Sequence, residues 1–194
     1  MPAPLPRVAT SIIERAQRGD RAAQAEIYGA FSAAVFTLAR RMLASRTLAE
    51  DVLQETFVDV LRKLGQYRGD AELYFWIRRI AVNKCLMHLR SAWLSRRCPD
   101  GDERLAAEPA RAVALDERIV LERALDALPD RARMVVWLHD VEGYTHKEIG
   151  ALMGYTTSFS KTQLARAHER LRTLIEGSPE TMSEELCVQA LKIC

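Results

Sequence analysis

The residues best suited to chemistry are a series of basic and amide side chains near the end of the chain, Lys161, Gln163, Arg166 and Arg170. They recur at spacings that fit one helix. Ammonium, guanidinium and amide groups near the start of a helix are the donors that read base edges and phosphates in the major groove of DNA. An ordinary helical hairpin with a solvated basic face is the alternative interpretation of this stretch.

The segment 145–172 contains the elements needed to position those donors. Thr145 and Glu148 have the spacing of a capping box at the start of a short helix. Gly154 supplies a corner, because glycine tolerates the positive φ of a tight turn. A second, basic helix then begins at residue 156 or 157. The pattern predicts a helix-turn-helix.

A second candidate site lies in the middle of the chain, on a helix predicted over residues 73–97. Trp76, Arg79, Asn83 and Arg90 fall within about 60° of one another on that helix. Bases stack on aromatic rings while cations follow phosphates, so this mixture suits single-stranded nucleic acid. A half-buried tryptophan among scattered surface cations is the alternative.

A third candidate site is acidic and lies on a helix predicted over residues 47–64. Asp51, Glu55 and Asp59 form a row about 200° from the apolar stripe of that helix, with Gln54 and Val58 on its shoulder. A solvated acidic face is a common feature of helices. The more specific hypothesis is a docking surface for a basic protein partner.

The remaining pattern predicts further helices and their core faces. Two helices fall within residues 8–44, separated at Gly19 and Asp20, with Asp20 as a cap. Thr47 and Glu50 have the spacing of a second capping box. Further helices are expected at 115–128 and from Pro129 to residue 141. The predicted core stripes are Ile27, Phe31, Val35, Leu38 and Met42; Leu53, Phe57, Val60, Leu61 and Leu64; Leu73, Ile77, Ala81 and Cys85; and Leu121, Leu125 and Leu128.

Composition and charge indicate how these helices are grouped. The chain has 194 residues, of which 48% are apolar, enough for one or two helical domains. Residues 98–113 combine prolines, a glycine and excess acid, which is typical of a flexible linker. We therefore predict an all-α protein with domains at 8–97 and 114–176, a linker at 98–113 and a tail at 177–194.

Several function classes are not supported by the sequence. The four histidines are scattered and match no nucleophile, phosphate-loop or metal motif, so we expect no enzyme activity, cofactor or metal. His139 and His146 flank a turn and are expected at the surface. The four cysteines form no CxxC pair, and Cys187 and Cys194 lie in the tail. The sequence contains no long apolar run of the kind that forms a membrane span or a signal peptide. We therefore expect a cytoplasmic protein without membrane insertion.

Two blocks of the sequence resemble a known family. AEDVLQETFVDVLRKLGQYRGDAELYFWIRRIAVNKCLMHLR (49–90) resembles region 2 of extracytoplasmic-function sigma factors of bacterial RNA polymerase. ALDALPDRARMVVWLHDVEGYTHKEIGALMGYTTSFSKTQLARAHERLR (124–172) resembles their region 4. The two blocks stand in the family's order, and with the N-terminal helices the resemblance covers about residues 10–175.

The resemblance implies roles and partners for the three groups of residues. The partners are core RNA polymerase, through its β′ clamp helices and β flap, promoter DNA, and an anti-sigma factor as a common means of control. Polymerase docking is implied for Asp51, Gln54, Glu55 and Val58. Contact with the −10 element is implied for Tyr67, Arg68, Phe75, Trp76, Arg79, Asn83 and Lys84. Contact with the −35 element is implied for Ser158, Lys161, Thr162, Gln163, Arg166 and Arg170.

The sequence departs from the family pattern at the start of the second helix. Ser160 stands where the family has an apolar anchor, so we expect Phe159 to take over that packing through a small rotation. Gln163 replaces an arginine, which removes one charge. The competing hypothesis is a stand-alone helix-turn-helix regulator, which leaves the acidic row and the Trp76 stripe unexplained.

Overall fold

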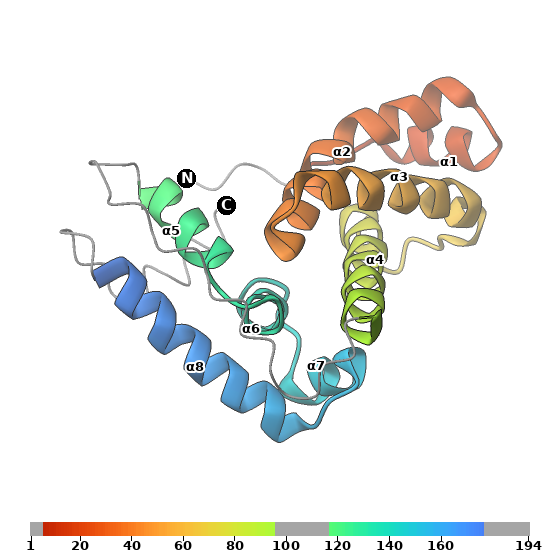
Figure 1. Cartoon of the computed structure of the whole chain (residues 1–194). Helices are drawn as coiled ribbons and strands as arrows, with labels where there is room; N and C mark the ends of the chain where they lie inside the picture. Colours follow the sequence, from red (N-terminus) through yellow and green to blue (C-terminus); the bar gives the residue numbers. More distant parts are fainter. Residues whose placement is uncertain (1–5, 96–116, 177–194) are drawn as a thin grey trace. The chain divides into compact units, whose positions relative to one another are not determined.

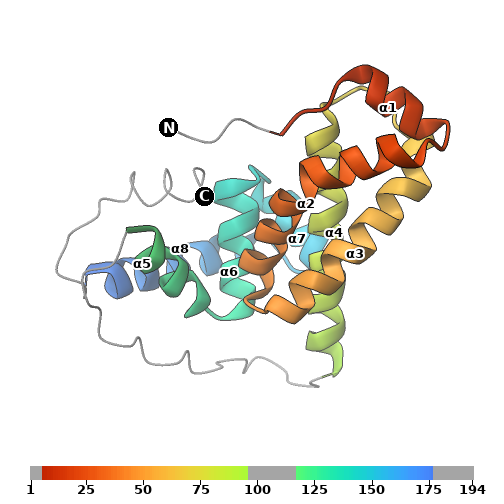
Figure 2. The same ribbon diagram turned by 90° about the horizontal axis from the view of Figure 1, so that it is seen from above.

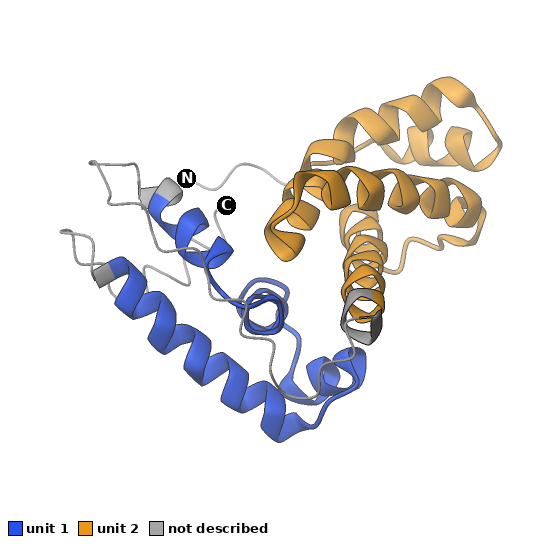
Figure 3. Ribbon diagram, viewed as in Figure 1, with its two compact units in different colours: residues 1–3, 92–194 blue, residues 4–91 orange. Residues whose placement is uncertain are grey.

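The computed structural model describes residues 6–95 and 117–176, and every regular element within these ranges is a helix (Figure 1). The all-α prediction is therefore confirmed. The chain divides into two compact units, residues 4–91 and residues 1–3 with 92–194 (Figure 3). The predicted linker at 98–113 and the predicted tail, with Cys187 and Cys194, lie outside the described residues, and the predicted domain limits stay predictions.

The first unit contains α1 (Thr10–Gln17), α2 (Arg21–Leu43), α3 (Arg46–Lys63), the short 3₁₀ helix η1 (Leu64–Gln66) and most of α4 (Leu73–Ser95). Helix α2 packs against both α1 and α3 (Figure 2). The Asp20 side chain accepts hydrogen bonds from the backbone N–H groups of Ala22 and Ala23, at 2.9 and 3.2 Å. The predicted cap at Asp20 is therefore confirmed.

The capping box predicted at Thr47 and Glu50 is wrong. Helix α3 begins at Arg46, and the Ser45 hydroxyl accepts from the N–H of Leu48. Ala44 adopts a left-handed conformation with φ of 48°, and Ser45 after it is extended, as an N-cap residue must be. Glu50 instead forms an ion pair with Arg46, at 2.9 Å.

The core of this unit follows the predicted stripes, with one exception on α3. The α2 stripe from Ile27 to Met42 and the α4 stripe from Leu73 to Cys85 are buried. On α3, Leu61 is 40% exposed and Leu53 is only half-buried, whereas Val52 and Thr56 are fully buried. The buried face of α3 is thus rotated from the predicted one, toward Val52 and Thr56 and away from Leu61.

The second unit contains α5 (Glu117–Asp126), α6 (Asp130–Val136), the π-helical turn η2 (Trp137–Val141), α7 (His146–Met153) and α8 (Thr157–Glu176). Helix α8 packs against α5, α6 and α7. The Thr145–Glu148 capping box is present, and Gly154 ends α7 with φ of 77°. The helix-turn-helix is confirmed, and the helix before it ends in a π turn that the sequence pattern did not predict.

The turn between α7 and α8 requires a glycine at position 150. A Cβ at Gly150 would lie 2.8 Å from the carbonyl oxygen of Tyr155, and that backbone cannot move without opening the turn. We therefore expect Gly150→Ala to lower the free energy of unfolding of the second unit by about 1–3 kcal/mol, as overpacking does. Urea denaturation followed by circular dichroism measures the change, and hydrogen exchange of peptides from α7 and α8 locates it.

Gly29 provides a matched control for that substitution. It lies within α2, and no heavy atom beyond its local helix backbone approaches the Cβ position within 4 Å. Gly29→Ala should raise stability by about 0.5–1 kcal/mol, because glycine in a helix loses more entropy on folding. Equal effects of the two alanines would contradict the steric role of Gly150.

Candidate functional site

The acidic row lies on the outer face of α3. Asp51, Gln54 and Glu55 are exposed, and Val58 beside them is 55% exposed. These residues follow one another at helical spacing, so a partner lying along α3 contacts all four. The structure brings together every residue predicted to dock on polymerase.

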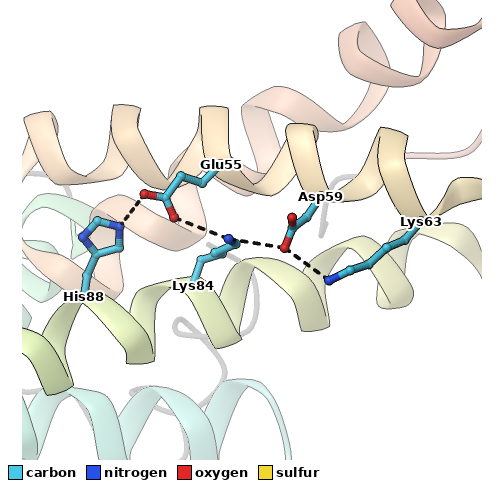
Figure 4. Close-up of polar contacts among 5 residues, drawn as sticks. All are labelled: Glu55, Asp59, Lys63, Lys84 and His88. Carbon is cyan, nitrogen blue, oxygen red and sulfur yellow. Dashed lines mark hydrogen bonds and ion pairs between the residues drawn. The ribbon is translucent and has the colours of Figure 1, made fainter.

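A charge network joins the acidic row to α4, as Figure 4 shows. The Lys84 ammonium lies 3.5 Å from a carboxylate oxygen of Glu55 and 3.3 Å from one of Asp59. The His88 Nε2 atom lies 3.1 Å from the other oxygen of Glu55, and Lys63 lies 3.2 Å from Asp59. The hydrogen bond from Lys63 lowers the pKa of Asp59, burial opposes the change, and Lys84 adds to it.

This network places Lys84 differently from the other residues predicted to contact the −10 element. Its side chain is only 17% exposed and points toward α3. An ammonium group between two carboxylates already has its counter-ions, so it is held away from the exposed stripe of α4. Sequence spacing alone did not show this pairing, because Lys84 and Glu55 lie on different helices.

An aromatic pair marks the start of the α4 stripe. The rings of Tyr67 and Trp76 lie 5.4 Å apart between centroids, inclined at 53°. The Tyr67 hydroxyl donates to the carbonyl oxygen of Ala71 at 2.5 Å, which ties the ring to its own loop. Burial raises the pKa of Tyr67, and Asp70 and Glu72 raise it further, so the hydroxyl stays protonated and donating at neutral pH.

The rest of the stripe is open to solvent. Phe75 is 50% exposed, and Arg79, Asn83 and Arg90 are also exposed along the same side of α4. Arg68 is exposed in the loop that carries Tyr67. Rings, guanidinium groups and an amide therefore share one surface, which suits stacking of bases and pairing with phosphates.

The predicted −35 residues lie on the first three turns of α8 and just beyond. Ser158, Lys161, Thr162, Arg166 and Arg170 are exposed, and Gln163 is half-buried. The Thr162 hydroxyl donates to the carbonyl oxygen of Ser158 at 3.0 Å, so the one donor of this side chain is used within the helix. The cationic groups of Lys161, Arg166 and Arg170 are open to solvent.

The expected rotation of Phe159 into the core is wrong. Ser160 is fully buried, whereas Phe159 is half-buried and stacks on Tyr155, with ring centroids 4.1 Å apart and planes 19° apart. Arg131 of α6 lies over the other ring, 5.4 Å from the Tyr155 centroid. The Phe159 ring packs in this stack, so α8 does not rotate to bury Phe159, and Ser160 stays on the buried face of the helix.

Comparison with known proteins decides the family. Family models described as Sigma-70 region 2 and Sigma-70, region 4 match residues 27–95 and 118–171. The RNA polymerase sigma-H factor of Pseudomonas aeruginosa is 30% identical over 177 residues, covering 82% of this chain and 90% of that protein. The ECF RNA polymerase sigma-E factor of Escherichia coli strain K12 is 28% identical over 180 residues, covering 85% and 93%. The chain is an extracytoplasmic-function sigma factor. It directs RNA polymerase to promoters.

The matched regions coincide with the two compact units of this sigma factor. Region 2 runs from α2 through α4, and region 4 runs from α5 into α8. Among solved structures, the sigma factor RpoE in complex with the anti-sigma factor NepR from Bartonella quintana is 22% identical, with a TM-score of 0.49, covering 78% of this chain and 95% of that chain. Among the described residues of the sigma factor, no helix is long and apolar enough to span a membrane.

A group of histidines in region 4 was not predicted. His139 and His146, expected at the surface, are half-buried and stack on each other, with ring centroids 4.6 Å apart. His139 and His168 both contact the Asp140 carboxylate, at 2.8 and 2.7 Å. The π turn η2 carries His139 and Asp140 side by side, and such turns are frequent at functional sites. The described residues contain no cluster of three or more potential metal ligands.

Proposed function

We propose that this sigma factor uses three separate surfaces for its three contacts in transcription initiation. Helix α3 docks on core polymerase, α4 with the preceding loop holds the opened −10 strand, and α8 reads the −35 element. The observation that carries the proposal is the Tyr67–Trp76 ring pair at the head of the exposed stripe Phe75, Arg79 and Asn83. A duplex-binding regulator has no use for such a stacking surface.

Docking through α3 is supported by charge and exposure. Asp51 and Gln54 are exposed, and the Glu55 side chain is 45% exposed even though it contacts Lys84 and His88. Val58 adds an apolar contact at the edge of the row. Complementary charge steers association and fixes register, so the partner surface is basic. The family resemblance assigns that surface to the β′ clamp helices.

Strand capture by α4 is supported by the chemistry of its stripe. Unpairing a base costs a few kcal/mol, and stacking on an aromatic side chain is worth about 1–3 kcal/mol per base. Trp76 and Phe75 supply the rings, Arg68 and Arg79 supply cations, and Asn83 supplies an amide. Lys84 joins this contact only if it leaves Glu55 and Asp59.

Recognition of the −35 element is assigned to α8, with Lys161 and Arg166 as its main contacts. Removal of one phosphate-neutralising cation reduces the salt slope of binding by about one. We therefore expect Lys161→Ala to weaken binding of a −35 duplex and to lower that slope by about one unit. Titrations at several salt concentrations measure both. The matched control is Lys147→Ala on α7, which should change neither value.

The remaining expectations fit this assignment. A subunit that positions polymerase on DNA needs no catalytic site of its own, and we propose that the sigma factor has none and works in the cytoplasm. The family resemblance gives region 4 a contact with the β flap. That contact and control by an anti-sigma factor stay predictions.

Transcription in vitro tests the proposal directly. The sigma factor is added to bacterial core polymerase with a genomic promoter library, and transcript starts are mapped. We expect starts that depend on the protein and share −35 and −10 elements. Binding of duplex DNA without any effect on transcript starts would contradict the proposal and favour a stand-alone regulator.

A further inference from the structure

The contact between α7 and α8 has a polar centre. Ser160 of α8 is fully buried, and its hydroxyl lies 3.0 Å from Nδ1 of His146, the first residue of α7. A buried hydroxyl without a partner costs free energy, so the imidazole is what makes serine acceptable there. This hydrogen bond links the two helices of the helix-turn-helix.

Contacts from His146 continue to the middle of α8. Its ring stacks on His139 of η2, which contacts Asp140, and Asp140 in turn contacts His168 of α8. The Asp140 side chain is only 6% exposed. Burial favours a higher pKa for Asp140, but hydrogen bonds from His168 and His139 outweigh it and hold that pKa below its usual value. Asp140 is therefore an anion at neutral pH.

We propose that His146, acting through Ser160, positions α8 for DNA recognition and makes discrimination of the −35 element dependent on pH. The inference rests on the −35 role proposed above for α8. Histidine is the side chain whose charge ordinarily changes between pH 5 and 8. Three of the chain's four histidines belong to this group.

The charges around His146 set the direction of the effect. His139 and Asp140 face it from η2, and Lys161 lies near it on α8. Burial lowers the pKa of His146, His139 and Lys161 lower it further, and Asp140 opposes them. Glu148 of the same helix is engaged in the capping box with Thr145. The first turn of a helix also disfavours a cation, because the helix dipole is positive there.

Protonation of His146 therefore places a cation where its neighbours disfavour one. The unfolded chain takes up this proton near pH 6.5, whereas the folded chain takes it up at lower pH. Stability contributed by neutral His146 is thus complete above about pH 6.5 and is lost as the pH falls toward the folded value. Repulsion between protonated His146 and Lys161 displaces the start of α8, where Ser158, Lys161 and Thr162 of the proposed −35 contacts lie.

The test compares specific with non-specific binding. The full chain is assembled with core polymerase, and its affinity is measured for a −35 duplex that stops short of the −10 element and for a scrambled duplex. The −35 sequence is taken from the mapped transcript starts. A new cation near DNA strengthens binding to both duplexes, so the ratio of the two dissociation constants isolates the positioning of α8.

We expect the ratio to fall about fivefold between about pH 7.5 and about pH 5.5, the low end of coupling between two binding events. The variant His146→Phe with Ser160→Val replaces the hydrogen bond by an apolar contact, and its ratio should stay constant over this range.

Each other outcome overturns the inference. If the ratio in the unaltered chain does not change with pH while the −35 duplex is still preferred, the role of His146 is refuted and the −35 assignment of α8 stands. An equal fall in the double variant does the same. Absence of discrimination at either pH refutes the −35 assignment of α8 as well. If the double variant does not fold, Ser160→Ala serves instead: its ratio at about pH 7.5 should drop toward the low-pH value of the unaltered chain, and an unchanged ratio overturns the inference.

Discussion

Replacing Asp51 with arginine is expected to weaken binding of core polymerase about a hundredfold, because juxtaposed like charges at an interface cost several kcal/mol. Asp51 is exposed on α3 at the N-terminal end of the proposed docking row, so the fold tolerates the change. Fluorescence anisotropy with labelled sigma factor and core polymerase measures the affinity. Circular dichroism should show the same melting curve as the unaltered chain.

The matched control places the same charge change elsewhere on the same unit. Glu26 is an exposed acidic residue of α2, and Glu26→Arg alters the net charge by the same amount as Asp51→Arg. It should leave polymerase affinity within about twofold, since isolated surface charges contribute little. If Asp51→Arg bound polymerase as tightly as Glu26→Arg, the docking surface would lie elsewhere.

The parts of the fold that were predictable depend on local rules. Thr145, Glu148 and Gly154 specify the start and end of α7 by side chains within a few residues, and spacing alone identified the buried face of α2. The exposed residues of α8 and α4 follow from the same periodicity. Local hydrogen bonds and helical geometry act over short distances along the chain, so they can be read from it.

Two local predictions failed because a competing signal was present nearby. Thr47 and Glu50 have the spacing of a capping box, but the N-cap residue of α3 is Ser45, which follows Ala44 with its left-handed backbone. Phe159 is an apolar side chain that could anchor α8 in the core, but it stacks on Tyr155 instead. The buried Ser160 forms a hydrogen bond with His146. In each case two side chains could meet the same requirement, a cap for α3 or a packing contact at the start of α8. The tertiary structure determines which of the two does so.

The features that the sequence did not reveal connect separate elements. Lys84 pairs with Glu55 and Asp59 across two helices, and the histidine group joins η2, α7 and α8. Scattered histidines carry no spacing signal, since tertiary packing brings them together. The spacing between Ser160 and His146, fourteen residues, becomes informative only when the turn of the helix-turn-helix is placed.

Truncating Trp76 to alanine is expected to reduce promoter opening about tenfold to a hundredfold, because one base–aromatic stack is worth about 1–3 kcal/mol. The half-buried Trp76 ring packs beside Tyr67 at the head of the α4 stripe, and no other described residue of that stripe except Phe75 offers an aromatic surface. Opening is measured with holoenzyme on a promoter that carries a fluorescent base analogue in the −10 element.

A second variant at the same position separates stacking from support of the fold. Trp76→Phe keeps an aromatic ring and should retain most of the opening. Polymerase affinity should be the same for both variants, since docking belongs to α3. If Trp76→Ala opened the promoter as well as Trp76→Phe, Trp76 would not hold the strand by stacking, and the ring pair would serve only to pack the loop against α4.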